Sequence, residues 1–304
     1  MFKPLFAALF GAMLLAAVPA QAIDITHDLG TTAVPDAPQR IVVLEYSFVD
    51  SLAAIGVAPV GIADDDKRDS IIPAYTAIIG DDWTSVGTRK SPSLEVIASL
   101  QPDLIIADTS RHEAIYDALS EIAPTISFDS LTGTYETAMA AAQTIADAIG
   151  KGPEMAERLK AHAATMDAFK AEIDVSGWSA QFLIDNGEGL FLHSPVSYNG
   201  SLLAWFGFKN NMPTPDGHTY EEAIVATSLE QLSEINPQII IRGKYVEPGL
   251  SDSWVGQPVY DSIEAVKSGH VFDVTAHEWS RLRGVLASEK SAADLVTIVK
   301  QLKQ

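Results

Sequence analysis

Cysteine is absent from the 304-residue sequence, and basic residues are scarce, with 20 Lys and Arg against 40 Asp and Glu. The lack of cysteine excludes disulfides, thiolate metal sites and a lipid-modified cysteine. The formal net charge of −20 at pH 7 argues against a nucleic-acid partner, because such proteins carry a basic surface. The same charge repels anions at long range, so an anionic ligand has to be met by a local cluster of arginines.

Sequence signatures of catalysis are missing as well. The chain contains no Gly-x-Ser-x-Gly nucleophile turn, no His-Glu-x-x-His zinc motif and no phosphate-binding glycine loop. We therefore predict a binding protein and not an enzyme, with no catalytic residue, no resident cofactor and no metal ligand of its own.

Only the N-terminal segment has a long apolar run. Residues 1–22 contain Lys3, an apolar stretch over residues 5–18 and a final Ala20-Gln21-Ala22, which fits the small-x-small rule for cleavage. We predict a signal peptide over residues 1–22. Export without a lipid-modified cysteine predicts a periplasmic protein that meets the membrane only through a partner.

One short passage occurs twice in the chain. Ser-Leu-Glu at residues 93–95 and 228–230 is followed in both places by apolar positions, a proline and a run of isoleucines and leucines. Each copy predicts a short helix capped by serine, a proline turn and a buried strand. The repetition predicts two lobes built on one plan, although helix–turn–strand units are common and coincidence is the alternative.

A long amphipathic helix is predicted between the two copies. Over residues 153–173 the apolar positions recur at helical spacing, and the proline at 153 suits the first helical turn. At 1.5 Å per residue the helix would be roughly 30 Å long. We predict an α/β protein with an N-terminal lobe over residues 23–150, a linking helix over 151–175 and a C-terminal lobe over 176–304. A surface helix of a single domain is the alternative.

Further local patterns place the remaining elements. Residues 40–45 predict a buried strand and 47–55 a helix, while Asn186-Gly187 predicts a hairpin. The acidic run at residues 63–68 and the polar stretch at residues 278–284 are both predicted to be loops, the first of them solvated. The C-terminal helix is expected over residues 285–302.

Arginines are the most informative candidates for ligand binding. Five of them fall in predicted loops or just beyond strand ends: Arg89, Arg111, Arg242, Arg281 and Arg283. Arginine binds carboxylates through two parallel hydrogen bonds and keeps its charge when desolvated. Arginines from both lobes that face one cleft would suit a multiply charged anion, whereas the alternative for each is a surface ion pair. Ser47, at the start of a helix, is a weaker candidate as a ligand donor, a helix cap or a nucleophile.

Histidines support a different hypothesis. His112, His193 and His277 could meet in a cleft, and three histidines with a carboxylate can bind zinc. A periplasmic zinc enzyme or zinc carrier is therefore an alternative. A secreted scaffold or sensor protein is another.

Two glutamates occupy matching places in the repeat. Glu95 and Glu230 each lie in the first turn of a predicted helix, where a negative charge suits the helix dipole. As a pair, one on each lobe, they could instead dock onto a partner with two-fold symmetry.

Several motifs resemble the periplasmic ferric-citrate-binding proteins, which belong to the iron-siderophore and cobalamin group of ABC-importer substrate-binding proteins. The similar segments cover most of the chain after residue 22 and lie at residues 38–45, 61–65, 85–89 and 102–108 and at Trp279-x-Arg281-x-Arg283-Gly284. The resemblance implies two α/β lobes joined by one long helix and a shallow cleft between them. It also implies that Glu95 and Glu230 meet arginines of a dimeric permease.

The same resemblance implies a set of cleft residues: Arg89, Arg111, Trp279, Arg281 and Arg283, with Ser47 and Tyr245 added. The chain departs from the ferric-citrate pattern at Tyr198, where that branch tends to have tryptophan, and at Arg242, where the family is often apolar. Tyr198 and Trp279 are expected to pack against the ligand.

The sequence thus predicts a monomeric periplasmic protein that binds ferric dicitrate, or a similar carboxylate-type iron chelate, and delivers it to an ABC importer. The iron would stay in its chelator. Another siderophore, haem or cobalamin is the alternative ligand.

Overall fold

The computed structural model describes residues 22–217 and 219–302. The predicted signal peptide, apart from Ala22, lies outside the described residues. Within the described part of the chain, no helix combines the length and apolar character that crossing a membrane requires.

The N-terminal lobe is built on a five-stranded parallel sheet in the order β5-β4-β3-β6-β7. Its strands are β3 (Ile41–Val43), β4 (Gly61–Ile62), β5 (Thr84–Ser85), β6 (Leu104–Asp108) and β7 (Thr125–Phe128). A separate antiparallel hairpin precedes it, made of β1 (Ala22–His27) and β2 (Gly30–Pro35). The helices of this lobe are α1 (Tyr46–Ala53), η1 (Arg68–Ser70), α2 (Pro73–Ile79), α3 (Leu94–Ser99), α4 (Thr109–His112), η2 (Glu113–Ile115), α5 (Tyr116–Ile122) and α6 (Tyr135–Ala148).

The C-terminal lobe contains a mixed five-stranded sheet in the order β10-β9-β8-β11-β12. β8, β11 and β12 are parallel, whereas β9 runs antiparallel to both β8 and β10. The strands are β8 (Ala180–Asp185), β9 (Leu190–His193), β10 (Ile224–Thr227), β11 (Ile239–Lys244) and β12 (Val271–Thr275). The helices are α8 (Tyr198–Phe206), α9 (Tyr220–Ala223), α10 (Leu229–Ile235), η3 (Leu250–Trp254), α11 (Pro258–Asp261), α12 (Glu264–Lys267), α13 (Ala276–Arg281) and α14 (Val285–Gln301).

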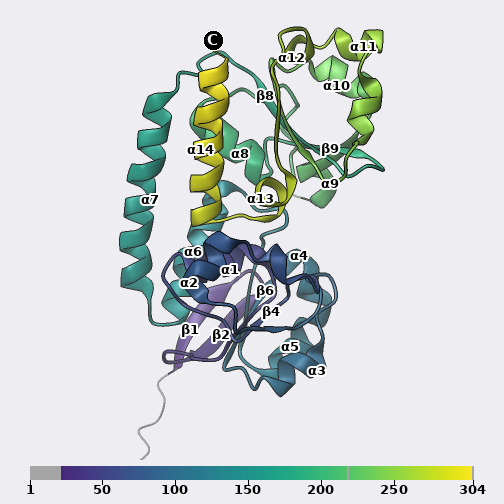
Figure 1. The fold of residues 1–304 in the computed structure, drawn as a ribbon. Coiled ribbons are helices and arrows are strands. Elements are labelled where there is room, and N and C mark those ends of the chain that lie inside the picture. The colour runs from purple at the N-terminus through teal and green to yellow at the C-terminus, as the bar shows by residue number, and fades with distance from the viewer. Residues whose placement is uncertain (1–21, 218, 303–304) are drawn as a thin grey trace, which may run out of the picture.

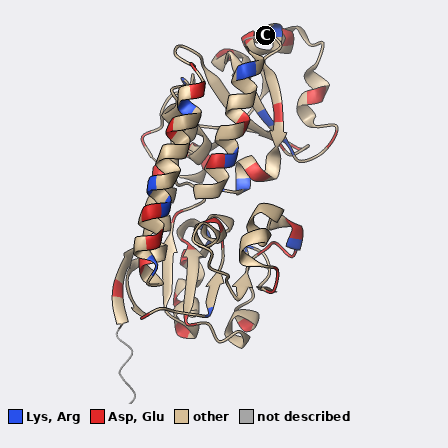
Figure 2. Ribbon diagram, turned by 60° about the vertical axis from the view of Figure 1, so that its left-hand side comes forward, with Lys and Arg blue, Asp and Glu red and all other residues tan. Residues whose placement is uncertain are grey.

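Helix α7 (Gly152–Glu172) runs alongside both lobes, as Figure 1 shows, and confirms the predicted long helix within one residue at each end. It packs against α6 and α14 through a narrow buried stripe that includes Met155 and Met166. Figure 2 shows that the rest of α7 carries charged residues of both signs along its length. A helix that buries so little surface depends on these few contacts for its position.

Each lobe has its own apolar core, but near the junction of the lobes some side chains of one lobe pack in the core of the other. Leu282 and Ala287, which flank the start of α14, pack in the core of the N-terminal lobe with Phe48 and Val49. Tyr135 of α6 packs in the core of the C-terminal lobe. The lobes are therefore joined by interlocking side chains as well as by α7.

The repeated passage forms the structure that its pattern predicts. The hydroxyls of Ser93 and Ser228 accept hydrogen bonds from the third residue beyond them and cap α3 and α10. The strands that follow are β6 and β11, and each lies between two other strands of its sheet. The hairpin at Asn186 is also confirmed, since β8 and β9 pair as an antiparallel unit around it.

One predicted loop is wrong, and the other is only partly solvated, because the acidic run forms a turn that exposes residues 66–68 but buries Asp64. In the acidic run, the Asp64 side chain is fully buried, where it accepts hydrogen bonds from Ser85 Oγ and from Trp83 Nε1. Residues 276–281 form the short helix α13, because Ala276 and Trp279, three residues apart, turn one face into the core.

Candidate functional site

A cavity of about 600 Å³ lies between the lobes, at the carboxyl ends of the parallel strands of both sheets. This is the edge at which open α/β sheets bind their ligands. Five cationic side chains line it: Lys67, Arg89, Arg111, Arg281 and Arg283. Its other walls include the aromatic residues Phe191, Tyr220 and Tyr245. Since no Asp or Glu of the described residues lines the cavity, the wall is cationic in a strongly acidic protein.

The strand ends place these cations. Arg89 lies in the loop after β5, and Arg111 lies on α4 directly after β6. These two strands are separated in the sheet by β4 and β3. Arg281 is the last residue of α13, and Arg283 lies in the turn before α14. The cavity therefore brings together arginines that are separated by up to two-thirds of the sequence.

The carboxylate of Glu45 binds two of the cavity arginines. It is fully buried, and it accepts hydrogen bonds from Arg89 Nη1 at 2.8 Å and from Arg111 Nε at 2.9 Å. Burial alone would raise the pKa of Glu45, but the charges of Arg89, Arg111 and Arg283 outweigh it and hold the pKa below its ordinary value. Glu45 therefore stays ionised, and it fixes where both guanidinium groups point.

Asp108 supports Arg111 through the backbone. Its buried side chain accepts hydrogen bonds from Arg111 N at 2.9 Å and from Ser130 N at 2.9 Å, and so caps α4. Burial raises the pKa of Asp108 to about 6, and the nearby charge of Glu45 adds to the shift. The carboxyl ties the helix that carries Arg111 to the loop after β7.

Arg283 has unused hydrogen-bonding capacity. Its side chain is buried and Nη2 donates to Ser280 O at 2.9 Å, yet Nη1 has no hydrogen-bond partner among the described residues. Burial lowers the pKa of this guanidinium, and the charge of Glu45 opposes the shift. A buried donor without a partner costs roughly 1–3 kcal/mol, so the position of this guanidinium has to be stabilised by its other contacts.

Comparison with known proteins agrees with this architecture. The family described as "Periplasmic binding protein" matches residues 41–277, which is most of the chain. The chain belongs to this family. As its members are binding proteins, the chain is not an enzyme.

Among relatives of this periplasmic binding protein, the Fe(3+)-citrate-binding protein YfmC of Bacillus subtilis is 40% identical over 90% of this chain and 84% of its own. The Fe(3+) dicitrate-binding periplasmic protein FecB of Escherichia coli is 38% identical over 95% of this chain and 94% of its own. Among solved structures, Staphylococcus aureus SirA complexed with staphyloferrin B is 26% identical with a TM-score of 0.77, covering 91% of this chain and 98% of that one. The α/β fold with two bridged lobes is that of such proteins.

Some predicted site residues of the periplasmic binding protein do line the large cavity. Arg89, Arg111, Arg281, Arg283 and Tyr245 converge there, and the Arg281 guanidinium lies 4.8 Å from the centre of the Tyr245 ring. Arg89, Arg111 and Tyr245 follow strands of two different sheets, whereas Arg281 ends α13 and Arg283 lies in the turn before α14. Their role in binding stays a prediction.

Trp279 does not reach the cavity. Its side chain is only 1% exposed, packs 5.4 Å from the Phe182 ring and donates from Nε1 to Asp294 at 3.0 Å. The expectation that Trp279 packs against a ligand is thus not met. It anchors α13 in the core, which positions the two arginines that follow it.

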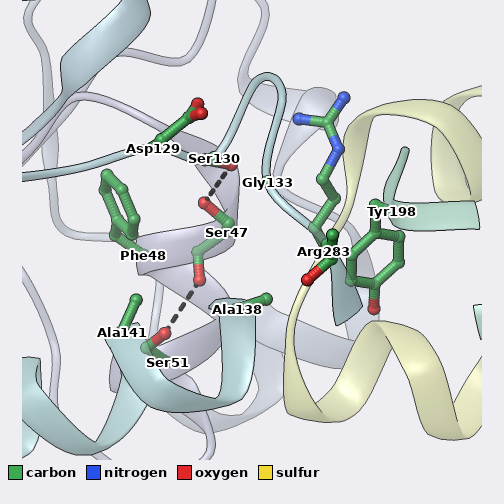
Figure 3. Close-up of a pocket in the computed structure, with 11 residues that line it drawn as sticks. Ser47, Phe48, Ser51, Asp129, Ser130, Gly133, Ala138, Ala141, Tyr198 and Arg283 are labelled. Atoms are coloured by element: carbon green, nitrogen blue, oxygen red, sulfur yellow. Dashed lines mark hydrogen bonds between the residues drawn. The ribbon is translucent and has the colours of Figure 1, made fainter. Parts of the chain in front are cut away.

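Tyr198 and Ser47 lie behind the cavity wall. Both line a separate void of about 10 Å³, which has room for about one water molecule. In Figure 3, Ser47 donates to Ser130 and the Arg283 guanidinium extends away from the Tyr198 ring. The Tyr198 hydroxyl donates to Gly284 O and accepts from Gly284 N, so it holds the turn that carries Arg283. The expected direct contacts of both residues with a ligand are not supported.

Arg242 is engaged elsewhere. It is buried, and its guanidinium donates to Asp273 at 2.7 and 3.1 Å and to Ser251 at 3.0 Å. Because it is absent from the cavity wall, the expectation that it reshapes the pocket is not met.

The three histidines of the zinc hypothesis do not meet. His112 accepts from Asp108 N and contacts Arg89 O, whereas His277 lies 2.8 Å from Ser70 O. His193 is buried, and burial lowers its pKa to about 3. Across the described ranges no group of three or more His, Asp or Glu could hold a metal ion, so the zinc alternative is wrong for this part of the chain.

Several site residues were not predicted from the sequence, among them the aromatic residues Phe191 and Tyr220 of the cavity wall. Glu45 was treated only as the end of a strand, and Lys67 and Asp65 fell in the acidic run that was predicted to be a solvated loop. A glutamate directly after a buried strand is a usable signal for Glu45, because that position lies at the binding edge of the sheet.

Proposed function

We propose that this protein binds ferric dicitrate, or a similar carboxylate-type iron chelate, in the periplasm and delivers it to an ABC importer. One observation carries the proposal. Within residues 22–217 and 219–302, five cationic side chains and no acidic ones line a cavity between the lobes, in a protein with a net charge of −20. Such a wall compensates several negative charges at once, and it is concentrated where the rest of the surface repels anions. The names of YfmC and FecB support the same ligand.

The free guanidinium edges define how the chelate would bind. Arg111 uses only Nε within the described part of the protein, so its two terminal nitrogens can donate to carboxylate oxygens of the ligand. Arg283 also lines the cavity, although its unpaired Nη1 is itself buried. Tyr245 and Phe191 offer flat apolar contacts beside them. The iron keeps its chelator ligands, and the protein supplies charge and hydrogen bonds only.

Delivery would use a second surface. Glu95 and Glu230 are both exposed in the first turns of α3 and α10, which Figure 1 places at opposite ends of the molecule. One glutamate from each lobe fits a dimeric permease with two equivalent basic patches. The protein would act as a monomer, located in the periplasm without a lipid anchor, since the sequence has no cysteine.

Calorimetric titration of the mature protein tests the ligand. Ferric dicitrate, iron-free citrate, a ferric catecholate and a ferric hydroxamate are compared at one salt concentration. We expect saturable binding of ferric dicitrate at micromolar concentration or below, and weakening by added salt because the contacts are ionic. Tight binding of a catecholate or hydroxamate without any response to ferric dicitrate would keep the importer role and discard the ligand.

A further inference from the structure

Among the ion pairs of the described residues, one joins the two lobes across the cavity. It links Asp65 of the N-terminal lobe to Arg281 of the C-terminal lobe. Asp65 Oδ2 lies 3.8 Å from Arg281 Nη1, and Arg281 belongs to α13 of the C-terminal lobe. That distance is too long for a hydrogen bond but short enough for a direct charge interaction. The contact therefore crosses the cleft at the level of the cationic wall.

Asp65 is held firmly in this place. Its Oδ1 accepts from Arg89 N at 2.9 Å, and its Oδ2 accepts from Arg89 Nη2 at 2.8 Å and Nε at 3.1 Å. Asp65 and Asp66 both have left-handed backbone conformations, with φ of 59° and 55°. Such angles are unusual for residues other than glycine, so the turn has to be stabilised by its contacts.

Arg89 has little capacity left for a ligand. One edge of its guanidinium is bound to Asp65, Nη1 is bound to Glu45, and its flat face covers the Tyr46 ring at 4.0 Å. The side chain is only 8% exposed. Arg89 therefore serves mainly to hold the Asp65 carboxylate in position beside the cavity.

Arg281 is in the opposite situation. Its side chain is 39% exposed, and its only ion pair within the described segments is the long one to Asp65. A ligand carboxylate can approach it at a shorter distance and with two hydrogen bonds, as arginine prefers. The two carboxylates would then compete for one guanidinium.

We propose that Asp65 acts as an internal competitor of the anionic ligand, because its carboxylate already occupies one side of Arg281. The inference rests on the function proposed above and adds a rule of specificity. A chelate has to engage Arg111 and Arg283 as well as Arg281 in order to outweigh Asp65. A monocarboxylate, which can reach only one of these arginines well, would not bind.

The test is the affinity of Asp65→Asn for ferric dicitrate. Asparagine keeps the size of the side chain and one acceptor for Arg89, but it removes the negative charge next to Arg281. We expect ferric dicitrate to bind about 3- to 10-fold more tightly. This is the range expected when a partly exposed ion pair with Arg281 is lost and the Asp65 charge no longer repels the anionic ligand. Equal or weaker binding would overturn the proposal, because that is the result expected if Asp65 only positions Arg89 and does not compete with the ligand.

Asp66→Asn is the matched control. Asp66 has the same charge and nearly the same backbone conformation one residue later, but its side chain is exposed. Its substitution should leave the affinity within about 2-fold of the unmodified protein, because exposed charges are screened by solvent. A gain in affinity as large as that of Asp65→Asn would mean that any lost negative charge near the cavity strengthens binding. It would overturn the proposal of a specific contact between Asp65 and Arg281.

A double-mutant cycle checks that Arg281 mediates the effect. In an Arg281→Gln background, Asp65→Asn should no longer tighten binding, because no guanidinium remains to be released. A gain of the same size with and without Arg281 would overturn the proposal. Thermal unfolding of all four proteins confirms that each is folded.

A readout without the chelate separates this inference from the proposed function. Phenylglyoxal modifies accessible arginines, and peptide mass spectrometry reports the rate at Arg281. We expect about 2- to 5-fold faster modification of Arg281 in Asp65→Asn, the range that corresponds to loss of a weak ion pair. Faster modification without any chelate binding would retain the contact and discard the ligand, whereas an unchanged rate would overturn the inference.

Discussion

Asp50 of α1 accepts a hydrogen bond from the backbone N–H of Ala287 at 2.8 Å, and so one lobe caps a helix of the other. The same carboxylate accepts from Leu286 N at 3.1 Å and from the Tyr75 hydroxyl at 2.6 Å. A negative charge at the start of α14 suits the positive end of its dipole. A Cβ on Gly284 would lie 2.4 Å from Asp50, so glycine is required for this approach.

Asp50→Asn should change how stability depends on pH. Burial raises the pKa of Asp50 from 3.8 to about 6 in the folded protein. The folded state thus binds the proton more tightly, and the resulting stability is complete below the ordinary pKa and lost as pH rises through 6. We expect the unfolding free energy of the native protein, relative to Asp50→Asn, to fall by about 2 kcal/mol between pH 4 and pH 7. Urea titrations at several pH values measure this, and parallel curves would contradict it.

Glu289→Gln should have the opposite pH profile. Burial would raise the pKa of Glu289, but hydrogen bonds from His162 at 2.9 Å and Arg158 at 2.8 Å outweigh it and lower the pKa to about 2. The stability is present above the ordinary pKa of 4.5 and is lost as pH falls toward 2. Allowing for partial exposure, we expect a loss of about 1–2 kcal/mol at neutral pH and almost none near pH 2. A constant difference across that range would show that these contacts to α7 act through packing alone.

Arg111→Gln and Arg281→Gln should each weaken ferric dicitrate binding by about 1–3 kcal/mol, the range for hydrogen bonds to charged groups. Arg242→Gln is the matched comparison, because Arg242 is also an ion-paired arginine but lies outside the cavity. Its affinity should be unchanged although its stability falls. Titration calorimetry of the three variants measures their affinities for ferric dicitrate. Equal losses in all three would contradict the assignment of the cavity as the ligand-binding site.

Trp279→Phe should separate packing from binding. The substitution keeps an aromatic ring against Phe182 but removes the hydrogen bond to Asp294 and some buried volume. We expect a loss of about 1–3 kcal/mol in unfolding free energy and an affinity within about 2-fold of the native value. A large loss of affinity in a stable variant would return Trp279 to the binding site.

Glu95→Ala combined with Glu230→Ala should abolish transport and preserve ligand affinity. Both side chains are exposed and lie on helices away from the cavity wall, so the substitutions should not disturb the fold. Uptake of radioactive iron in cells that express the importer, with titration of the purified variant, measures the two properties. Normal uptake by the double variant would contradict the docking role.

The sequence alone determined the features that depend on neighbouring residues. Ser93 and Ser228 cap their helices because the hydroxyl and the N–H that it accepts from are three residues apart. The length of α7 and the hairpin at Asn186 follow from periodicity and turn chemistry in the same way. The placement of Arg89 and Arg111 near the carboxyl ends of their strands was also predictable, since parallel strands end at one edge of their sheet.

Only the tertiary structure decided which side chains face the cavity. Trp279 and Arg242 resemble ligand-binding residues in their sequence context, but Phe182 and Asp294 bury the first and Asp273 binds the second. The segment around Asp65 has the composition of a solvated loop, yet the Asp65 side chain is hydrogen-bonded to Arg89, 24 residues later in the chain. A side chain's burial and its partners depend on residues distant in sequence, so local patterns place a residue at the right edge of a sheet without telling which way it points.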